Sequence, residues 1–172
     1  MNDARGQPIG DVLDARARAW PEAITPVSRM MVQVFRLSDL VLQQATATVQ
    51  SLGLTFSEFE VLATLRSFPA PHELAPGDLC AAVLISSGGL TKVLHALEDR
   101  GLISRSAGKA DRRSKPVRLT TRGRGVAERA MAGVLGVDHE LVSGALSKAE
   151  VAELTRLTGK LLARLEQPST SG

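Results

Sequence analysis

Apolar residues recur every three or four positions along two long segments, one toward each end of the chain. In the first segment the apolar positions are Val27, Met30, Met31, Val34, Leu37, Val41, Ala45, Val49 and Leu52. In the second segment they are Val151, Leu154, Leu157, Leu161 and Leu165. This period is that of an amphipathic helix. Thr25–Pro26 and the pair Ser147 and Glu150 are typical helix starts, and Gly53 is a typical helix end. We therefore predict a long helix near each end, with a shorter one over 11–20 before the first.

A helix–turn–helix is predicted between these long helices. Thr55 and Glu58 have the spacing of a capping box and open a helix that runs into a loop with three prolines over 68–76. A short helix over 77–83 follows, and a serine-bearing turn leads into a helix over 88–100. The turn is about as short as in the DNA-binding form of this motif.

The pattern then changes to that of two short strands. Residues 102–105 and 115–119 have the composition of strands, and a loop with Gly108 joins them. Thr120 or Thr121 begins a further helix. The predicted order from the first long helix is four helices, a hairpin and two helices. This order predicts a mainly α protein with a small β-hairpin, of the α+β class. A helix–turn–helix followed at once by a hairpin is a winged helix-turn-helix.

Positive charge is concentrated in the predicted hairpin. Between Arg105 and Arg124 stand eight basic residues and one acidic residue, Asp111, whereas the rest of the chain has 13 basic and 17 acidic side chains. A mildly acidic body with one basic segment indicates a site for a polyanion. A solvated basic loop is the alternative interpretation.

Composition excludes several classes of protein. Aromatic residues are 3% of the chain, which disfavours binding of single-stranded nucleic acid by stacking. One cysteine excludes a disulfide framework and multi-cysteine zinc sites.

Because no nucleophile elbow, phosphate-binding loop or metal-ligand spacing is present, we expect no enzyme, cofactor or metal. No apolar stretch approaches the roughly 18 residues that span a bilayer. The start of the chain lacks an apolar secretion signal. We therefore expect a cytoplasmic protein without a membrane partner.

The predicted winged helix has residue types that suit duplex DNA. The outward positions at the start of the second helix are short or basic, namely Ser86, Ser87, Gly88, Thr91, Lys92 and His95. The candidate DNA contacts of the hairpin are Arg112, Arg113, Lys115 and Arg118. An arginine gains from the negative potential of the minor groove. Asp111 stands two residues before Arg113, where a carboxylate can orient the guanidinium. An ordinary exposed ion pair is the alternative at Asp111.

Two motifs resemble those of the MarR family, the multiple-antibiotic-resistance regulators. Asp111-x-Arg113-x5-Leu119-Thr120 resembles the wing motif of the family, and residues 97–103 (LEDRGLI) resemble its junction between recognition helix and wing. The resemblance covers about Val27 to Leu165 and implies a homodimer whose terminal helices intertwine. It also implies that Arg113 enters the minor groove of a pseudo-palindromic operator and that Asp111 orients it. We expect a sequence-specific regulator, a repressor of its own and neighbouring genes.

The resemblance also implies a division of the chain. We expect a single domain over 10–167 with disordered tails over 1–9 and 168–172. Within the domain, residues 10–54 and 121–167 would be the dimerisation helices, and residues 55–120 the winged helix-turn-helix lobe.

A small anionic or aromatic effector is implied by the family as well, bound between the dimerisation helices and the DNA-reading lobe. Trp20, Glu60 and Arg105 resemble the set used by the urate-responsive branch, so urate or a phenolic or carboxylate compound is expected. The chain departs from that branch in having Glu60 in place of Asp, and Val93 where the branch has a polar or basic residue. Each of the three residues also has an alternative interpretation. Trp20 would be a packing anchor, Glu60 a solvated residue and Arg105 a phosphate contact.

Two further interpretations concern Cys80 and the fold as a whole. Cys80 lies in an apolar helical segment, which favours a small buried side chain over an oxidant sensor.

A winged-helix module that binds proteins without reading DNA sequence is the alternative function, and the density of basic residues around Asp111 argues against it.

Overall fold

The computed structural model describes residues 7–83, 87–105 and 116–167, and the chain divides between Phe56 and Ser57 into two compact units. Each unit is described by itself. Among the described residues, no helix combines the length and apolar character that crossing a bilayer requires.

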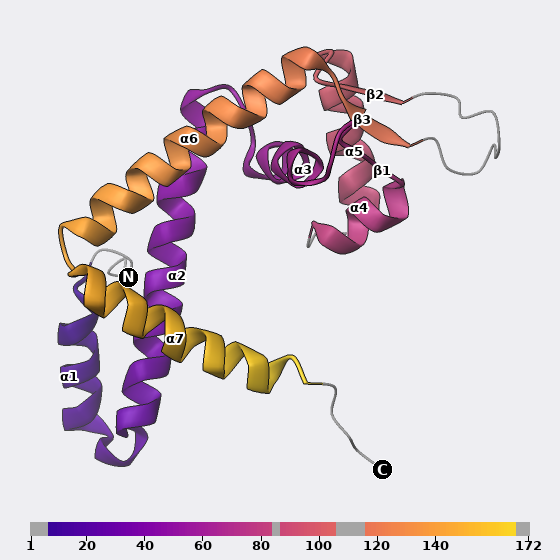
Figure 1. The fold of residues 1–172 in the computed structure, drawn as a ribbon. Helices are drawn as coiled ribbons and strands as arrows, with labels where there is room; N and C mark the ends of the chain where they lie inside the picture. The colour runs from indigo at the N-terminus through magenta and orange to yellow at the C-terminus, as the bar shows by residue number, and fades with distance from the viewer. Residues whose placement is uncertain (1–6, 84–86, 106–115, 168–172) are drawn as a thin grey trace, which may run out of the picture. The chain divides into compact units, whose positions relative to one another are not determined.

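The first unit is a pair of helices joined by a short 3-10 helix (Figure 1). Its elements are α1 (Ile9–Ala19), η2 (Pro21–Ala23) and α2 (Pro26–Ser51). Thr25 caps α2 because its hydroxyl accepts from the backbone N–H of Ser28, and the Ser28 hydroxyl accepts from the N–H of Thr25 in return. Leu13 of α1 is fully buried, and Asp14 lies 3.5 Å from Arg29 of α2. The predicted early helix is therefore present, and it begins at Ile9.

The second unit holds a small sheet that lies beside several helices (Figure 1). Its elements are α3 (Phe56–Ser67), β1 (Glu73–Leu74), α4 (Pro76–Ala82), α5 (Ser87–Asp99), β2 (Ile103–Arg105), β3 (Val117–Leu119), α6 (Thr121–Ser143) and α7 (Lys148–Leu165). The strands are antiparallel in the order β1-β3-β2, with Ser104 opposite Arg118 and Leu74 opposite Val117. This is the predicted winged helix-turn-helix, and the mainly α architecture with a small sheet is confirmed.

One strand contradicts the sequence prediction. Residues 68–76 were expected to be a loop only, but Glu73 and Leu74 form β1 and pair with β3. A strand of two residues is too short to show an alternating pattern in the sequence. Only its pairing with β3 identifies it as a strand.

The turn after α5 is held against the start of α6 by hydrogen bonds. Gly101 has a positive φ of 65°, which ends α5, and Leu102 donates its N–H to the carbonyl of Leu97. Thr120 caps α6 by accepting from the N–H of Gly123, and its hydroxyl lies within hydrogen-bond distance of the carbonyls of Gly101 and Leu102. One threonine therefore ties the end of the sheet to the turn after α5.

Candidate nucleic-acid interface and pockets

Helix α5 has one buried and one exposed face. Leu90, Leu94 and Leu97 are buried, with exposed fractions of 3% or less. On the opposite side Gly88, Thr91, Lys92 and His95 are all exposed. The predicted DNA-reading positions that the structure describes thus share one accessible face. Ser87 is the first residue of the helix, and Ser86 lies outside the described residues.

The sheet carries one of the predicted phosphate contacts on its outer face. Val117 and Leu119 are buried, whereas Arg118 between them is exposed. This alternation is that of a strand with one solvated face. The other candidates of the hairpin, Asp111, Arg112, Arg113 and Lys115, lie outside the described residues.

Glu98, in the last turn of α5, and Arg100, just after the helix, make ion pairs with two different elements. Nη1 of Arg100 lies 3.0 Å from Oε1 of Glu58, a side chain of α3 that is only 8% exposed. Oε2 of Glu98 lies 3.2 Å from Nε of Arg105 at the end of β2. The orientation of α5 is therefore fixed by charge on two sides as well as by its buried leucines.

Arg105 lines a cavity of about 430 Å³ between α4, α5 and β2. The other lining residues are Pro76, Gly77, Cys80, Leu90, Thr91 and Leu94. Within the described part of the chain, Nε and Nη2 of Arg105 are buried and have no hydrogen-bond partner, because the contact with Glu98 is an ion pair without hydrogen-bond alignment. A mainly apolar cavity with a buried cation suits a small organic anion.

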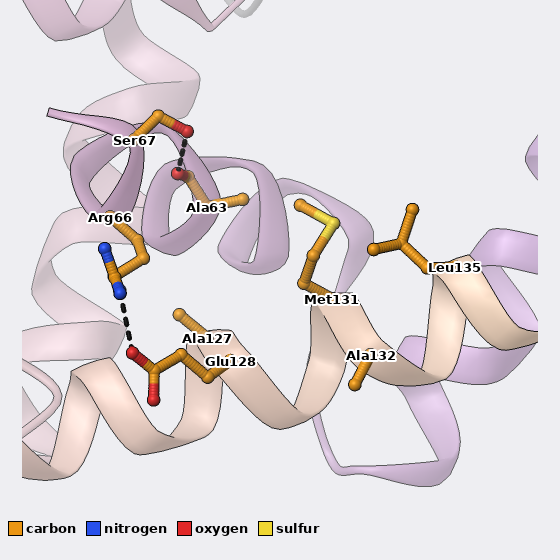
Figure 2. Close-up of a pocket in the computed structure, with 8 residues that line it drawn as sticks. All are labelled: Ala63, Arg66, Ser67, Ala127, Glu128, Met131, Ala132 and Leu135. Atoms are coloured by element: carbon orange, nitrogen blue, oxygen red, sulfur yellow. Dashed lines mark hydrogen bonds and ion pairs between the residues drawn. The ribbon is translucent and has the colours of Figure 1, made fainter.

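A second cavity of about 410 Å³ lies between α3 and α6 (Figure 2). At one end Nε of Arg66 lies 2.8 Å from Oε1 of Glu128, and at the other end stand Met131 and Leu135. Both charged residues of this pair are about half exposed. The cation of this groove thus already donates a hydrogen bond to a carboxylate, whereas Nε and Nη2 of Arg105 have only the ion pair with Glu98 among the described residues.

The three predicted effector residues occupy different places. Trp20 follows the last residue of α1 in the first unit and is 64% exposed. Glu60 is half-buried on α3 and lines neither of the two cavities. Arg105 is the member of the set that lines one of these cavities.

The structure corrects the interpretation of Cys80. Cys80 is partly exposed and lines the Arg105 cavity, so it is not an ordinary buried core residue. The lining residues of α4 and of α5 both have the spacing i, i+1, i+4, which places each set on one helix face. The sequence contains this spacing, but only the packing of the two helices shows that the faces meet.

Comparison with known proteins gives close sequence relatives. Residues 52–114 match the model of the MarR family. The HTH-type transcriptional repressor Rv2887 of Mycobacterium tuberculosis is 31% identical over 128 residues, which are 74% of this chain and 89% of the relative. The transcriptional repressor MprA of Escherichia coli K12 is 31% identical over 136 residues, which are 79% of this chain and 76% of the relative.

Solved structures agree with these relatives. The MarR family protein Rv2887 in complex with p-aminosalicylic acid has a TM-score of 0.61 at 31% identity, covering 76% of this chain and 95% of that one. BpsR of Bordetella bronchiseptica, whose DNA binding is regulated by 6-hydroxynicotinic acid, has a TM-score of 0.60 at 28% identity, covering 75% and 98%. Sco3205 of Streptomyces coelicolor in complex with DNA shares the fold, with a TM-score of 0.70 at 20% identity over 87% and 94%. This chain belongs to the MarR family of transcriptional regulators.

Proposed function

We propose that this protein is a homodimeric, sequence-specific repressor that reads duplex DNA through α5 and the hairpin and is released by a small aromatic acid. The observation that carries the proposal is the exposed face of α5, formed by Gly88, Thr91, Lys92 and His95. Short and basic side chains on an accessible helix suit the edges and phosphates of a major groove. Repression belongs to the proposal because two relatives, Rv2887 and MprA, are named transcriptional repressors, and we propose that the repressed genes are its own and neighbouring ones.

The hairpin would supply the remaining contacts. Arg118 is exposed on β3 and would meet a phosphate, together with Lys115. Arg113 would enter the minor groove, with Arg112 beside it and Asp111 orienting it. Loss of one phosphate contact lowers the slope of log affinity against log salt by about one unit. Arg118→Gln should therefore flatten this slope by that amount and weaken all duplexes alike.

Exposed apolar surface on the long helices supports the homodimer. On α2 the exposed large apolar side chains are Val27, Met30, Met31, Val34, Phe35, Leu37, Leu40 and Leu42. At 100° per residue they cover an arc of roughly 220°. A monomer rarely exposes so much contiguous apolar surface, and an arc this wide needs more than one partner helix.

The effector is proposed to bind in the Arg105 cavity. Its volume falls within the roughly 300–1,000 Å³ of small-molecule sites. The buried guanidinium nitrogens Nε and Nη2 would donate hydrogen bonds to a carboxylate, and Leu90 and Leu94 would contact a ring. In the related structures, p-aminosalicylic acid and 6-hydroxynicotinic acid are both aromatic carboxylic acids. Urate, a ring compound that is also an anion, is the second candidate.

A fluorescence-anisotropy titration tests the DNA-binding part of the proposal. DNA from upstream of the coding sequence is compared with a scrambled duplex at the same salt concentration, and we expect a preference of about 10³-fold or more. Equal binding of both duplexes would contradict sequence reading. Absence of binding at low salt would favour the protein-interaction module instead.

Release by a ligand is tested on the same complex with millimolar salicylate and, separately, urate. Salicylate should dissociate the wild-type complex but not that of Arg105→Met. Arg66→Met is the matched control, because it removes the cation of the α3–α6 groove instead. Loss of the salicylate response in Arg66→Met alone would assign the effector to that groove.

A further inference from the structure

The strongest unexplained feature of the Arg105 cavity is a carboxylate that lies outside its lining. Glu98 is on the last turn of α5 and contacts Arg105 through the 3.2 Å ion pair. It is not among the residues that line the cavity. The same guanidinium therefore faces a carboxylate of the protein and the space in which the effector is proposed to bind.

We propose that Glu98 is an internal competitor of the effector carboxylate for Arg105, and that this competition couples the cavity to the recognition helix. The inference rests on the proposed effector site and adds the residue through which that site acts on α5. Glu98 is then a positioning residue, since it acts through Arg105 and not on the ligand.

The geometry leaves Arg105 incompletely satisfied. Its side chain is 20% exposed, yet Glu98 offers Nε only a charge contact, and Nη2 has no hydrogen-bond partner among the described residues. A guanidinium binds a carboxylate best through two parallel N–H···O bonds. A ligand carboxylate that reaches Arg105 in this way makes a better pair than Glu98 does, so exchange of one carboxylate for the other is favourable.

Exchange of Glu98 for the ligand carboxylate at Arg105 would remove one of the ion pairs that position α5. Glu98, in the last turn of the helix, forms an ion pair with Arg105 of β2. Arg100, just after the helix, forms an ion pair with Glu58 of α3 at 3.0 Å. When the ligand carboxylate binds Arg105, the Glu98–Arg105 ion pair to β2 is lost, whereas the Arg100–Glu58 ion pair to α3 remains. The DNA-reading face of α5 then shifts within one lobe, and the ligand acts because it binds the untied state more tightly.

The first test measures salicylate affinity by isothermal titration calorimetry. Glu98→Gln should bind salicylate about five-fold more tightly than wild type, the ratio that corresponds to an ion pair of about 1 kcal/mol. Glu98→Asp, whose carboxylate is one methylene shorter, should shift the affinity in the same direction. Asp99→Asn is the matched control, because it removes the same charge at the next, exposed position of α5. It should bind salicylate as wild type does.

The second test measures coupling as the ratio of DNA affinities without and with saturating salicylate. This ratio should be smaller in Glu98→Gln than in wild type and unchanged in Asp99→Asn. A substitution that only destabilised the lobe would weaken both salicylate and DNA binding and would not tighten either.

The outcomes separate the two proposals. If Arg105→Met loses the salicylate binding of wild type but Glu98→Gln binds salicylate as wild type does or more weakly, the competition is wrong and the effector site stands. If wild type binds no salicylate, the effector site and the competition are both wrong.

Discussion

Gly123, in the first turn of α6, is the described glycine at which an added Cβ would come nearest to another backbone atom. A Cβ built on Gly123 would overlap the carbonyl oxygen of Leu102, which cannot move away because Thr120 holds it to the start of α6. We expect Gly123→Ala to lower the free energy of unfolding by about 3 kcal/mol. The measurement is urea denaturation followed by circular dichroism.

Gly136 provides the matched control in the same helix. No atom lies within 4 Å of a Cβ built there. Alanine has the higher helix propensity, so Gly136→Ala should be neutral or raise the free energy of unfolding by up to about 1 kcal/mol. Equal effects of the two substitutions would show that the approach to Leu102 does not constrain Gly123.

Single residues also show where sequence reasoning stops. Thr55 and Glu58 have the spacing of a capping box, which is a local pattern. The structure shows in addition that Glu58 is buried and paired with Arg100, 42 positions away. A partner so distant leaves no periodic signal. For this reason the sequence could not predict that Glu58 of α3 pairs with the residue after α5. It could not predict for the same reason that Cys80 lines a cavity.

At the scale of elements, the start of α7 is a capping box with a titratable member. The backbone N–H and the hydroxyl of Ser147 donate to Oε2 of Glu150 at 2.8 and 2.7 Å. These hydrogen bonds, the side-chain one first, lower the pKa of Glu150. A carboxyl whose pKa is lowered by folding stabilises the helix above its ordinary pKa, and this contribution is lost as pH falls through the lowered value.

Ser147→Ala should therefore raise the pKa of Glu150 toward its ordinary value of 4.5. The pKa is measured by NMR titration of the side-chain carboxyl. Thr155→Ala is the control, because its hydroxyl donates to the carbonyl of Val151 within the same helix and does not contact Glu150. An unchanged Glu150 pKa in Ser147→Ala would mean that the capping box does not persist in solution.

The accuracy of the predicted elements follows from how local their signals are. The helices with caps and a 3.6-residue period, α2 and α7, agree with the prediction closely. The start of α6 at Thr121 after the cap Thr120 also agrees. β1 was missed because its evidence is the pairing of Glu73 and Leu74 with β3 rather than its own two residues.

At the scale of the whole molecule, α7 is a helix without a buried side. None of its residues is buried, and Leu154, Leu157, Leu161, Leu162 and Leu165 are exposed by 44% or more. Most of the stability of a helix in a protein comes from packing of its apolar face, and α7 has no such packing within this chain's described residues. The amphipathic pattern predicted the helix, but it does not identify what covers the apolar stripe.

We expect a second copy of the chain to cover this stripe. Leu157→Glu combined with Leu161→Glu, one helical turn apart, places two charges in the stripe and should convert the dimer to a monomer of 18.2 kDa in sedimentation equilibrium. Ala163→Glu, at an exposed position on the opposite side of α7, is the control and should leave the mass at that of the dimer. The melting temperature of the wild type should rise with protein concentration and that of the double variant should not, because only a dimer gains stability by mass action. A wild-type mass of 18.2 kDa at all concentrations would contradict the dimer, and α5 would then read one half-site alone.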